Sequence, residues 1–189
     1  RKWLKKYLTE GAILEIGAGE GKFNRDLGSG FVYTGLEFAG AKIKNKDILK
    51  VDYLKSNLEK KFDAIIFWES LEHVPRPQEY LKKTYKLLRH GGLVLIEVPR
   101  FDCLESRIFK SHWFHLDPPR HLSHLTNTGL DKILSRAGLV VRERRSVLAY
   151  EYVTWGFAES LLGIFGIKST DYFKKNVFGF FLFTVYFFS

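Results

Sequence analysis

The sequence predicts an α/β fold with an open, mostly parallel sheet and helices on both of its faces. Two apolar runs, at residues 12–17 and 61–68, are typical of strands buried inside a parallel sheet. A third run, residues 31–37, ends in Glu37, 20 residues after Gly17. The first run breaks into a loop with glycine at alternate positions: Gly17, Gly19 and Gly21. A strand, a glycine loop and an acid at this spacing indicate a nucleotide-binding sheet.

The glycine loop predicts a ligand that lies against the backbone, because only glycine leaves no side chain in the way. Its glycines follow the pattern G-x-G-x-G. The dinucleotide-binding pattern G-x-G-x-x-G requires glycine at position 22, which is Lys22 in this chain. A nicotinamide oxidoreductase is therefore disfavoured. From the loop alone, a structural glycine turn in another kind of α/β protein stays open.

Size and composition limit the range of functions. At 189 residues the chain is long enough for one domain with a substantial core. Its single cysteine, Cys103, excludes an internal disulfide and fits a reducing, cytoplasmic compartment. The net charge of +9 favours an anionic partner, but no run of Lys and Arg is long enough for a nucleic-acid-binding arm. We therefore expect a membrane surface or an acidic substrate, and no nucleic acid.

The N-terminal half predicts alternating helices and strands. Residues 1–10 predict an amphipathic helix, not a signal peptide, and residues 21–27 predict a short helix after the glycine loop. Residues 38–46 are too few for a loop, a helix and a second loop, so the helix usual before a third strand is expected to be missing. This short segment, the start at Arg1 and the lack of methionine indicate either missing parts of the gene product or replaced methionines.

The segment after residues 61–68 has the most specific pattern in the sequence, F-D-A-I-I followed by L-E-H-V and proline. Pro77 begins a predicted helix that ends at Gly91 and Gly92, and residues 93–99 predict a fifth strand. These motifs, with E-x-G-x-G-x-G around the glycine loop and L-R-H-G-G before the fifth strand, resemble those of the class I S-adenosylmethionine-dependent methyltransferases. The small-molecule group that includes the ubiquinone O-methyltransferases is the most similar. The resemblance spans about residues 10–145.

This resemblance implies a Rossmann-like sheet with strand order 3-2-1-4-5-7-6 and S-adenosylmethionine across the carboxyl ends of its first strands. It implies that Glu15 orders the glycine loop and that Glu37 binds the ribose. Asp47 and Ile48, at the end of the third strand, would frame the adenine, and Trp68 and Glu69 would line the floor near the sulfonium. The full set of predicted cofactor-binding residues is Glu15, Gly17, Ala18, Gly19, Gly21, Glu37, Asp47, Ile48, Trp68 and Glu69.

The methyl acceptor is expected to meet residues from two other segments. Residues 100–125 show no helix or strand period, and a long irregular loop in a compact domain is usually functional. We predict that this loop is a lid, in which Trp113 and Phe114 exclude water and three polar side chains contact an anionic acceptor: His115, Arg120 and His121. His73 is either a general base or a structural histidine. A metal site was weighed for the histidines of the loop, but no helical period fixes their spacing and we predict none.

The C-terminal part divides into two segments. Thr126 predicts the cap of a helix that ends at Gly138, and residues 139–144 predict a sixth strand. We place the S-adenosylmethionine-binding domain at residues 1–146 and a hydrophobic segment at residues 147–189, whose last 13 residues carry no charge. This segment is either a membrane-surface element at the inner face of the membrane or a final core strand with a homodimer contact.

The predicted function is methyl transfer from S-adenosylmethionine to a small molecule, with S-adenosylhomocysteine as product. A sugar or a glycan- or lipid-linked intermediate is the first candidate acceptor, and O-methylation in quinone biosynthesis is the main alternative. A catalytically silent S-adenosylmethionine-binding subunit is the alternative from a different class. The sequence does not choose among O-, N- and C-methylation.

Overall fold

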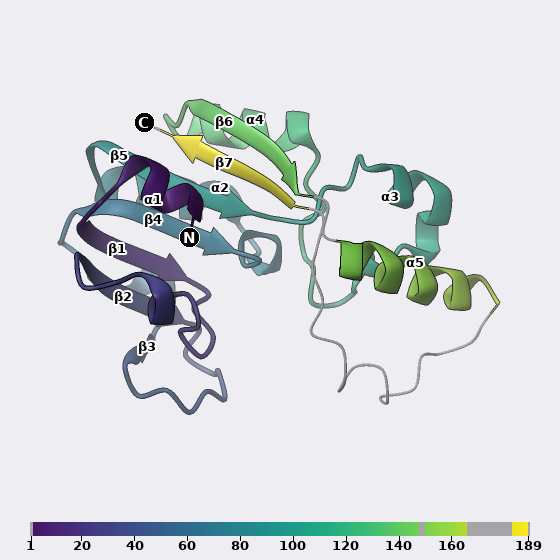
Figure 1. Cartoon of the computed structure of the whole chain (residues 1–189), viewed down its shortest axis with the longest axis horizontal. Helices are drawn as coiled ribbons and strands as arrows, with labels where there is room; N and C mark the ends of the chain where they lie inside the picture. Colours follow the sequence, from purple (N-terminus) through teal and green to yellow (C-terminus); the bar gives the residue numbers. More distant parts are fainter. Residues whose placement is uncertain (1, 148–149, 166–182, 189) are drawn as a thin grey trace.

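A seven-stranded sheet forms the centre of the molecule (Figure 1). The computed structural model describes residues 2–147, 150–165 and 183–188. The strand order β3-β2-β1-β4-β5-β7-β6 confirms the expected order; β1 to β5 pair in parallel, and β7 pairs antiparallel with β5 and β6. The strands are β1 (Gly11–Ile16), β2 (Phe31–Glu37), β3 (Ile48–Lys50), β4 (Phe62–Trp68), β5 (Leu88–Glu97), β6 (Val141–Val147) and β7 (Phe183–Phe188).

Helices cover both faces of this sheet, as predicted. Successive side chains of a strand point to opposite faces, so Ile13 and Leu14 of β1 belong to different cores. Leu4 packs from the N-terminal helix on the face of Ile13, whereas Leu81 and Leu134 pack from two other helices on the face of Leu14. The α-helices are α1 (Lys2–Tyr7), α2 (Pro77–Leu87), α3 (Leu104–Phe109), α4 (Asn127–Arg136) and α5 (Tyr150–Ile164).

Two predicted element boundaries are wrong. The helix expected over residues 21–27 is a turn followed by a 3-10 helix, Asn24–Asp26, because Gly21 adopts φ +70° and leaves too few residues before Gly28 for a stable α-helix. The helix expected to end at Gly91 and Gly92 already ends at Leu87, and β5 begins at Leu88. By contrast, residues 38–46 contain no helix, which confirms that the usual one is missing.

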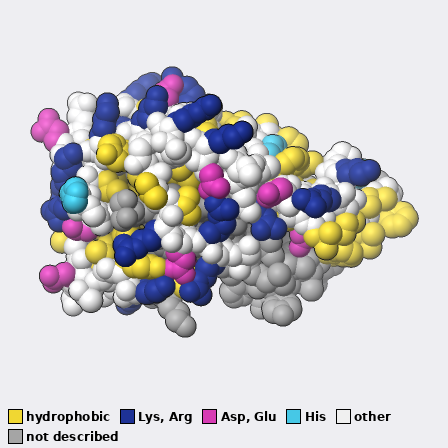
Figure 2. All heavy atoms as spheres, turned by 90° about the horizontal axis from the view of Figure 1, so that it is seen from above, with side chains coloured by type: hydrophobic (Ala, Val, Ile, Leu, Met, Phe, Trp, Pro, Cys, Tyr) yellow, Lys and Arg dark blue, Asp and Glu magenta, His cyan; other side chains and the backbone are white. Residues whose placement is uncertain are grey.

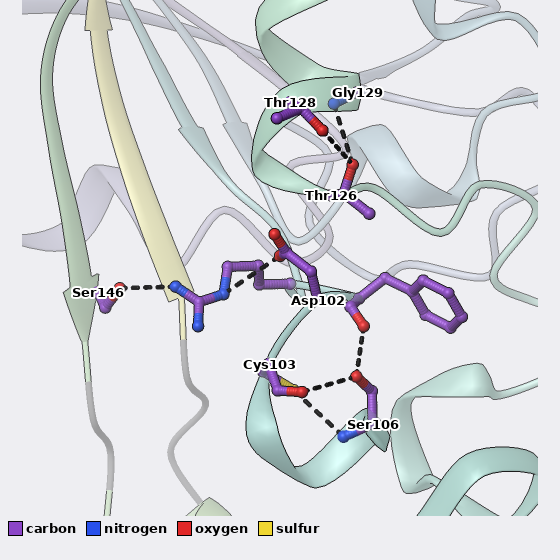
Figure 3. A network of polar contacts seen from close by, with 9 residues as sticks. Asp102, Cys103, Ser106, Thr126, Thr128, Gly129 and Ser146 are labelled. Carbon is purple, nitrogen blue, oxygen red and sulfur yellow. Dashed lines mark hydrogen bonds and ion pairs between the residues drawn. The ribbon is translucent and has the colours of Figure 1, made fainter.

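The segment after β5 was predicted to be irregular, and this prediction is wrong. The segment contains α3 and two 3-10 helices, Lys110–His112 and Phe114–Leu116. The Ser106 hydroxyl lies within hydrogen-bond distance of the carbonyls of Phe101 and Cys103, between which it shares its one proton, and so fixes the start of α3 (Figure 3). The start of α3 depends on hydrogen bonds of a polar side chain, which a search for a period of apolar residues does not detect. This segment and α5 form a lobe beside the carboxyl ends of the strands (Figure 1).

Thr126 caps α4 as predicted, because its hydroxyl accepts a hydrogen bond of 3.0 Å from the Gly129 N–H (Figure 3). Residues 183–188 form β7 between β5 and β6. Of the two predicted alternatives, this part of the C-terminal segment is therefore the strand. Residues 177–182 and 189 lie outside the described residues. None of the described helices is long and apolar enough to cross a membrane.

Candidate functional site

The glycine loop leaves β1 at its carboxyl end and uses its glycines for two different purposes. A Cβ atom on Gly17 would lie 2.4 Å from the Cβ of Ser70, so Gly17 lets the loop after β4 pack closely. The Ser70 hydroxyl holds this arrangement with a 2.6 Å hydrogen bond to the Ile16 carbonyl. A Cβ atom on Gly19 would meet nothing within 4 Å. The side of Gly19 on which a side chain would stand is therefore open, as a cradle for a ligand requires.

A pocket of about 620 Å³ lies between this loop and the end of β4. Its volume is within the range of small-molecule sites. Phe23 and Trp68 form an aromatic wall, with ring centroids 5.8 Å apart. Five of the ten residues predicted to bind the cofactor line this pocket: Glu15, Gly17, Ala18, Gly19 and Trp68.

Two carboxylates, those of Glu37 and Glu15, lie at the glycine loop. Glu37, at the carboxyl end of β2, accepts hydrogen bonds from the N–H of Gly19 at 2.8 Å and of Phe38 at 3.0 Å. Glu15 is buried and accepts a hydrogen bond from the Tyr33 hydroxyl. Burial, and then the charge of Glu15, raise the pKa of the Tyr33 hydroxyl, so it stays protonated as the donor. The structure thus brings both predicted acids to the glycine loop.

The position of Asp47 differs from the prediction. Asp47 precedes β3, whereas the predicted adenine site lies at the carboxyl ends of the strands. The acid just beyond the carboxyl end of β3 is Asp52, whose carboxylate accepts the Leu54 N–H at 2.9 Å. Without the usual helix to mark its start, the strand was placed too early in the sequence. The run I-L-K-V before Asp52 is the signal that could have located it.

Ile48 and Gly21, which were also predicted to bind the cofactor, pack against each other where β3 meets the glycine loop. Ile48 is only 4% exposed, and its Cδ1 would lie 3.0 Å from a Cβ atom on Gly21. A Cβ atom on Gly35 would come within 2.5 Å of the same methyl group. These three residues bring β2, β3 and the loop together, and neither Ile48 nor Gly21 is among the residues that line the pocket.

Three carboxyl groups gather at the carboxyl ends of β4 and β5. Burial raises the pKa of Glu69 to about 7. Burial, together with the neighbouring acids, raises that of Glu72 to about 8 and that of Glu97 to about 9. Glu69 has φ +48°, an uncommon conformation for a residue other than glycine. Such strain concentrates at functional sites, and Glu69 directly follows the pocket residue Trp68.

Beside these acids lie two histidines that are 48 residues apart in the sequence. The rings of His73 and His121 meet edge to face, with centroids 4.7 Å apart. Each ring Nδ1 contacts a backbone carbonyl: that of Arg120 at 2.9 Å for His73, and that of His115 at 2.7 Å for His121. Because a carbonyl can only accept, both Nδ1 atoms carry a proton. Burial lowers the pKa of His121, which keeps this ring neutral.

The other predicted acceptor residues occupy different positions. Trp113 is buried, packs with Cys103 and Phe109, and so forms the core of the lobe instead of a lid. His115 lies against the rings of Trp113 and Phe114, and burial lowers its pKa to about 4. Arg120 is exposed and pairs with Asp117 at 2.5 Å. Of the loop residues, Arg120 and His121 therefore lie at the acid and histidine cluster, whereas His115 lies inside the lobe.

Comparisons with known proteins agree with this geometry. A family model described as a methyltransferase domain matches residues 2–144. The chain belongs to the methyltransferase-domain family. This family agrees with the resemblance from which S-adenosylmethionine is expected as cofactor and S-adenosylhomocysteine as product.

Individual relatives share at most about a third of their residues with this chain in the matches described next. A ubiquinone biosynthesis O-methyltransferase from Vibrio atlanticus is 30% identical over 116 residues, which are 54% of this chain and 46% of that protein. The methyltransferase thus spans about half the length of the curated relatives that it matches. Two solved structures share its fold. The YcgJ protein from Bacillus subtilis has a TM-score of 0.67 and 14% identity, and the match covers 99% of this chain and 94% of that one. A SAM-dependent methyltransferase from Archaeoglobus fulgidus has a TM-score of 0.63 and 20% identity, and the match covers 100% of this chain and 90% of that one.

Proposed function

We propose that this methyltransferase transfers a methyl group to an oxygen atom of a small, anionic acceptor. The observation that carries the proposal is that the pocket and the cluster of acids and histidines adjoin each other at the carboxyl edge of the sheet. At that edge, the glycine-loop pocket ends at Trp68, and the acids and histidines begin at the next residue, Glu69. A methyl donor in the pocket would therefore face an acceptor beside the histidines.

The residues present fit S-adenosylmethionine. Gly19 offers an open cradle, Glu37 is held at the loop for two adjacent hydroxyls of the ribose, and Asp52 takes the adenine position that the sequence had given to Asp47. The carboxyls of Glu69 and Glu97, once ionised, favour a positive charge nearby. When bound, S-adenosylmethionine supplies a methyl group on a sulfonium, which needs no further activation. The chain then has to align the acceptor oxygen with that methyl group.

The acceptor proton also needs a destination. Since the Nδ1 of His73 carries a proton that it donates to the Arg120 carbonyl, its Nε2 keeps a lone pair. This side chain is exposed and can therefore act as the general base for a hydroxyl acceptor. With the cofactor bound, His73 would accept the proton that the acceptor oxygen loses as it takes the methyl group, and the carbon–sulfur electron pair would stay with the cofactor's sulfur.

An anionic acceptor is supported by the cation Arg120 at this edge. Arg120 is mostly exposed and pairs with an oxygen of Asp117, and within the described part of the chain its guanidinium has further donors for a carboxylate or a phosphate. A phenol that also carries a carboxylate and a sugar phosphate both combine a hydroxyl with an anionic group, and so belong to this acceptor class. The partial match to ubiquinone O-methyltransferases makes phenolic compounds the first to test.

Contact with the inner face of a membrane is part of the proposal. Apolar side chains gather at the end of the molecule where α3 and α5 lie (Figure 2). The exposed ones are Leu104, Ile108, Phe157, Leu161, Ile164 and Phe165. Such a patch suits the interface of a bilayer or a second copy of the chain. Ile108→Glu should reduce sedimentation with anionic liposomes; unchanged sedimentation would contradict the membrane contact.

The function is tested in two stages. Thermal shift with S-adenosylmethionine, S-adenosylhomocysteine and NAD should show stabilisation by the first two only. Methyl transfer from radiolabelled S-adenosylmethionine is then measured for phenols, catechols and sugar phosphates. Cofactor binding without transfer to any acceptor class would favour the silent subunit over the enzyme.

A further inference from the structure

We propose that the amino edge of the sheet carries a second ligand site, for a flat aromatic ring that bears a carboxylate or a phosphate. A pocket of about 560 Å³ opens there, which is within the range of small-molecule sites. It is lined by Tyr85 of α2, by residues 88–91 at the start of β5, and by Gly138 and Leu139 after α4. None of these residues lines the glycine-loop pocket.

The length of β4 separates this pocket from the cofactor pocket. In the parallel pair of β4 and β5, Phe62 lies beside Leu88, and Trp68 lies beside Glu97. Leu88 lines the second pocket, whereas Trp68 lines the glycine-loop pocket. At about 3.3 Å per residue, the distance along the strand from Phe62 to Trp68 is about 20 Å. A ligand at the amino edge is therefore a different molecule from the methyl donor and from the acceptor at the carboxyl edge.

The start of β5 bulges out of the strand and forms one wall of the pocket. Between two of its paired positions, β5 has residues 89–92 where β4 has Asp63 alone. A bulge of this kind re-aims side chains relative to a regular strand. Gly91 lies in the bulge with φ +72°, and a Cβ atom on it would meet nothing within 4 Å. The wall is therefore open on the side where Gly91 lacks a side chain.

Tyr85 supplies an aromatic surface that is held from one side. A Cβ atom on Gly138 would lie 3.2 Å from the Tyr85 ring, so the ring rests against this glycine. Tyr85 is nevertheless 54% exposed, which leaves ring surface on which a second ring can stack. Leu88 and the buried Leu139 add apolar surface beside it. These side chains favour a flat, apolar ring as one part of the ligand.

Basic side chains around the pocket favour an anionic group as the other part. Arg89 donates from Nη1 to the two carboxylate oxygens of Asp63, at 2.7 and 2.6 Å, which fixes its guanidinium. Within the described part of the chain no partner takes its Nε or Nη2, so these nitrogens remain for a carboxylate or a phosphate. The exposed His90 follows directly in the bulge.

The wider surroundings have the same sign of charge. Three segments line or adjoin the pocket: residues 60–63, 85–92 and 136–140. Their charged side chains other than the Asp63–Arg89 pair are all basic: Lys60, Lys61, Lys86 and Arg136. A positive field of this kind raises the local concentration of anions.

Two kinds of compound share the required chemistry, aromatic carboxylates and nucleoside monophosphates. Both combine a planar ring for Tyr85 with an anion for Arg89. A neutral aromatic compound lacks the contact with Arg89, and a free phosphate lacks the contact with Tyr85. The site should therefore bind compounds with both groups more tightly than compounds with one.

The test is a calorimetric titration of the full chain with benzoate, adenosine monophosphate, benzyl alcohol and inorganic phosphate. The protein is first saturated with S-adenosylhomocysteine, so that adenosine monophosphate cannot enter the cofactor pocket. Benzoate or adenosine monophosphate should bind once per chain, at least tenfold more tightly than benzyl alcohol and phosphate. The tighter of the two shows which kind of compound the site takes. Benzoate is also titrated without S-adenosylhomocysteine, which keeps the test independent of the proposed function.

Two variants alter the second pocket and leave the cofactor pocket intact. Tyr85→Leu removes the ring but keeps an apolar contact with Gly138. Gly91→Asn places a side chain in the open space, at a positive φ that asparagine tolerates better than most residues. Each should weaken binding of the tighter probe by at least tenfold. Tyr85→Phe is the matched control and should bind the probe as the native chain does. S-adenosylhomocysteine affinity should stay native in all three variants, which shows that they fold.

Arg120→Ala separates the second site from the acceptor side of the cleft. Probe binding that persists in Arg120→Ala and is lost in Tyr85→Leu is the expected result. Binding that is lost in Arg120→Ala and kept in Tyr85→Leu would place the probe at the carboxyl edge and contradict the proposal. If the native chain binds neither benzoate nor adenosine monophosphate, or if Tyr85→Leu and Tyr85→Phe bind equally, the second site is wrong.

Discussion

The cofactor side and the acceptor side of this cleft are built in different ways. The cofactor side comes from the stretch between Glu15 and Glu37, where β1, the glycine loop and β2 are neighbours in sequence and in space. The acceptor side combines Glu69–His73 with Arg120 and His121, which meet through hydrogen bonds between segments far apart in the chain. The first side can be recognised from a motif, whereas the second requires the fold.

The two sides also differ in their electrostatics. On the cofactor side, Glu37 accepts two backbone hydrogen bonds at an open cradle. On the acceptor side, burial raises the pKa values of Glu69, Glu72 and Glu97. Changes on the cofactor side should therefore act on S-adenosylhomocysteine binding at any pH. Changes on the acceptor side should act on the acceptor or on the pH dependence.

The largest effect is expected for Gly17→Ala on the cofactor side. The new Cβ atom would lie 2.4 Å from Ser70, and the φ of +79° disfavours any side chain. We expect a loss of about 3 kcal/mol in the free energy of unfolding, measured by urea denaturation, and no measurable S-adenosylhomocysteine binding. Gly91→Ala is the control, with φ +72° but nothing within 4 Å of the new atom. Equal behaviour of the two variants would show that the packing against Ser70 is unimportant.

Arg120→Ala should act on the acceptor side alone. Loss of one charged hydrogen-bond donor at an exposed position should raise the KM for an anionic acceptor by about tenfold. The affinity for S-adenosylhomocysteine should stay at the native value. Arg107→Ala, on α3, serves as the matched control. A parallel loss of cofactor affinity would mean that Arg120 supports the fold of the cleft.

A smaller effect is expected from pH. Below pH 7 Glu69 is mostly protonated, and Glu97 stays protonated up to about pH 9. Raising the pH from 6 to 9 ionises Glu69 and only part of Glu97, and this added negative charge should favour the positively charged S-adenosylmethionine over neutral S-adenosylhomocysteine. The ratio of their affinities should shift by a few-fold, on the order of 1 kcal/mol. Calorimetry in EDTA measures it, and a ratio that is constant with pH, or the same slope in Glu69→Gln, would contradict this assignment.

The sheet order that the resemblance implied and the Thr126 cap that the local pattern predicted are both confirmed. Glu15 and Glu37 lie at the glycine loop, and their roles in cofactor binding stay predictions. Asp47 was predicted at the end of the third strand, and Asp52 was not considered, because the shortened connection before β3 removed the usual spacing. The burial of Trp113 could not be predicted either. Its partners Cys103 and Phe109 meet it only after α3 forms, and α3 depends on polar bonds that have no apolar period.

The histidine pair was out of reach for a similar reason. The metal alternative weighed in the sequence used spacing within residues 112–124, whereas the structure pairs His121 with His73. That pairing depends on the Glu72 carbonyl, which accepts two N–H groups from the segment after His121. Backbone bonds of this kind leave no side-chain pattern in the sequence.

The most direct test of the central claim is a calorimetric titration of S-adenosylhomocysteine into the native chain, Glu37→Ala and the exposed control Glu59→Ala. The native chain and the control should bind one molecule with equal affinity. Glu37→Ala should lose about 1.5–3 kcal/mol for each hydrogen bond to its carboxylate, which is at least a tenfold weaker affinity. Native affinity in Glu37→Ala, or no binding by the native chain, would contradict a methyl-donor site between the glycine loop and β2.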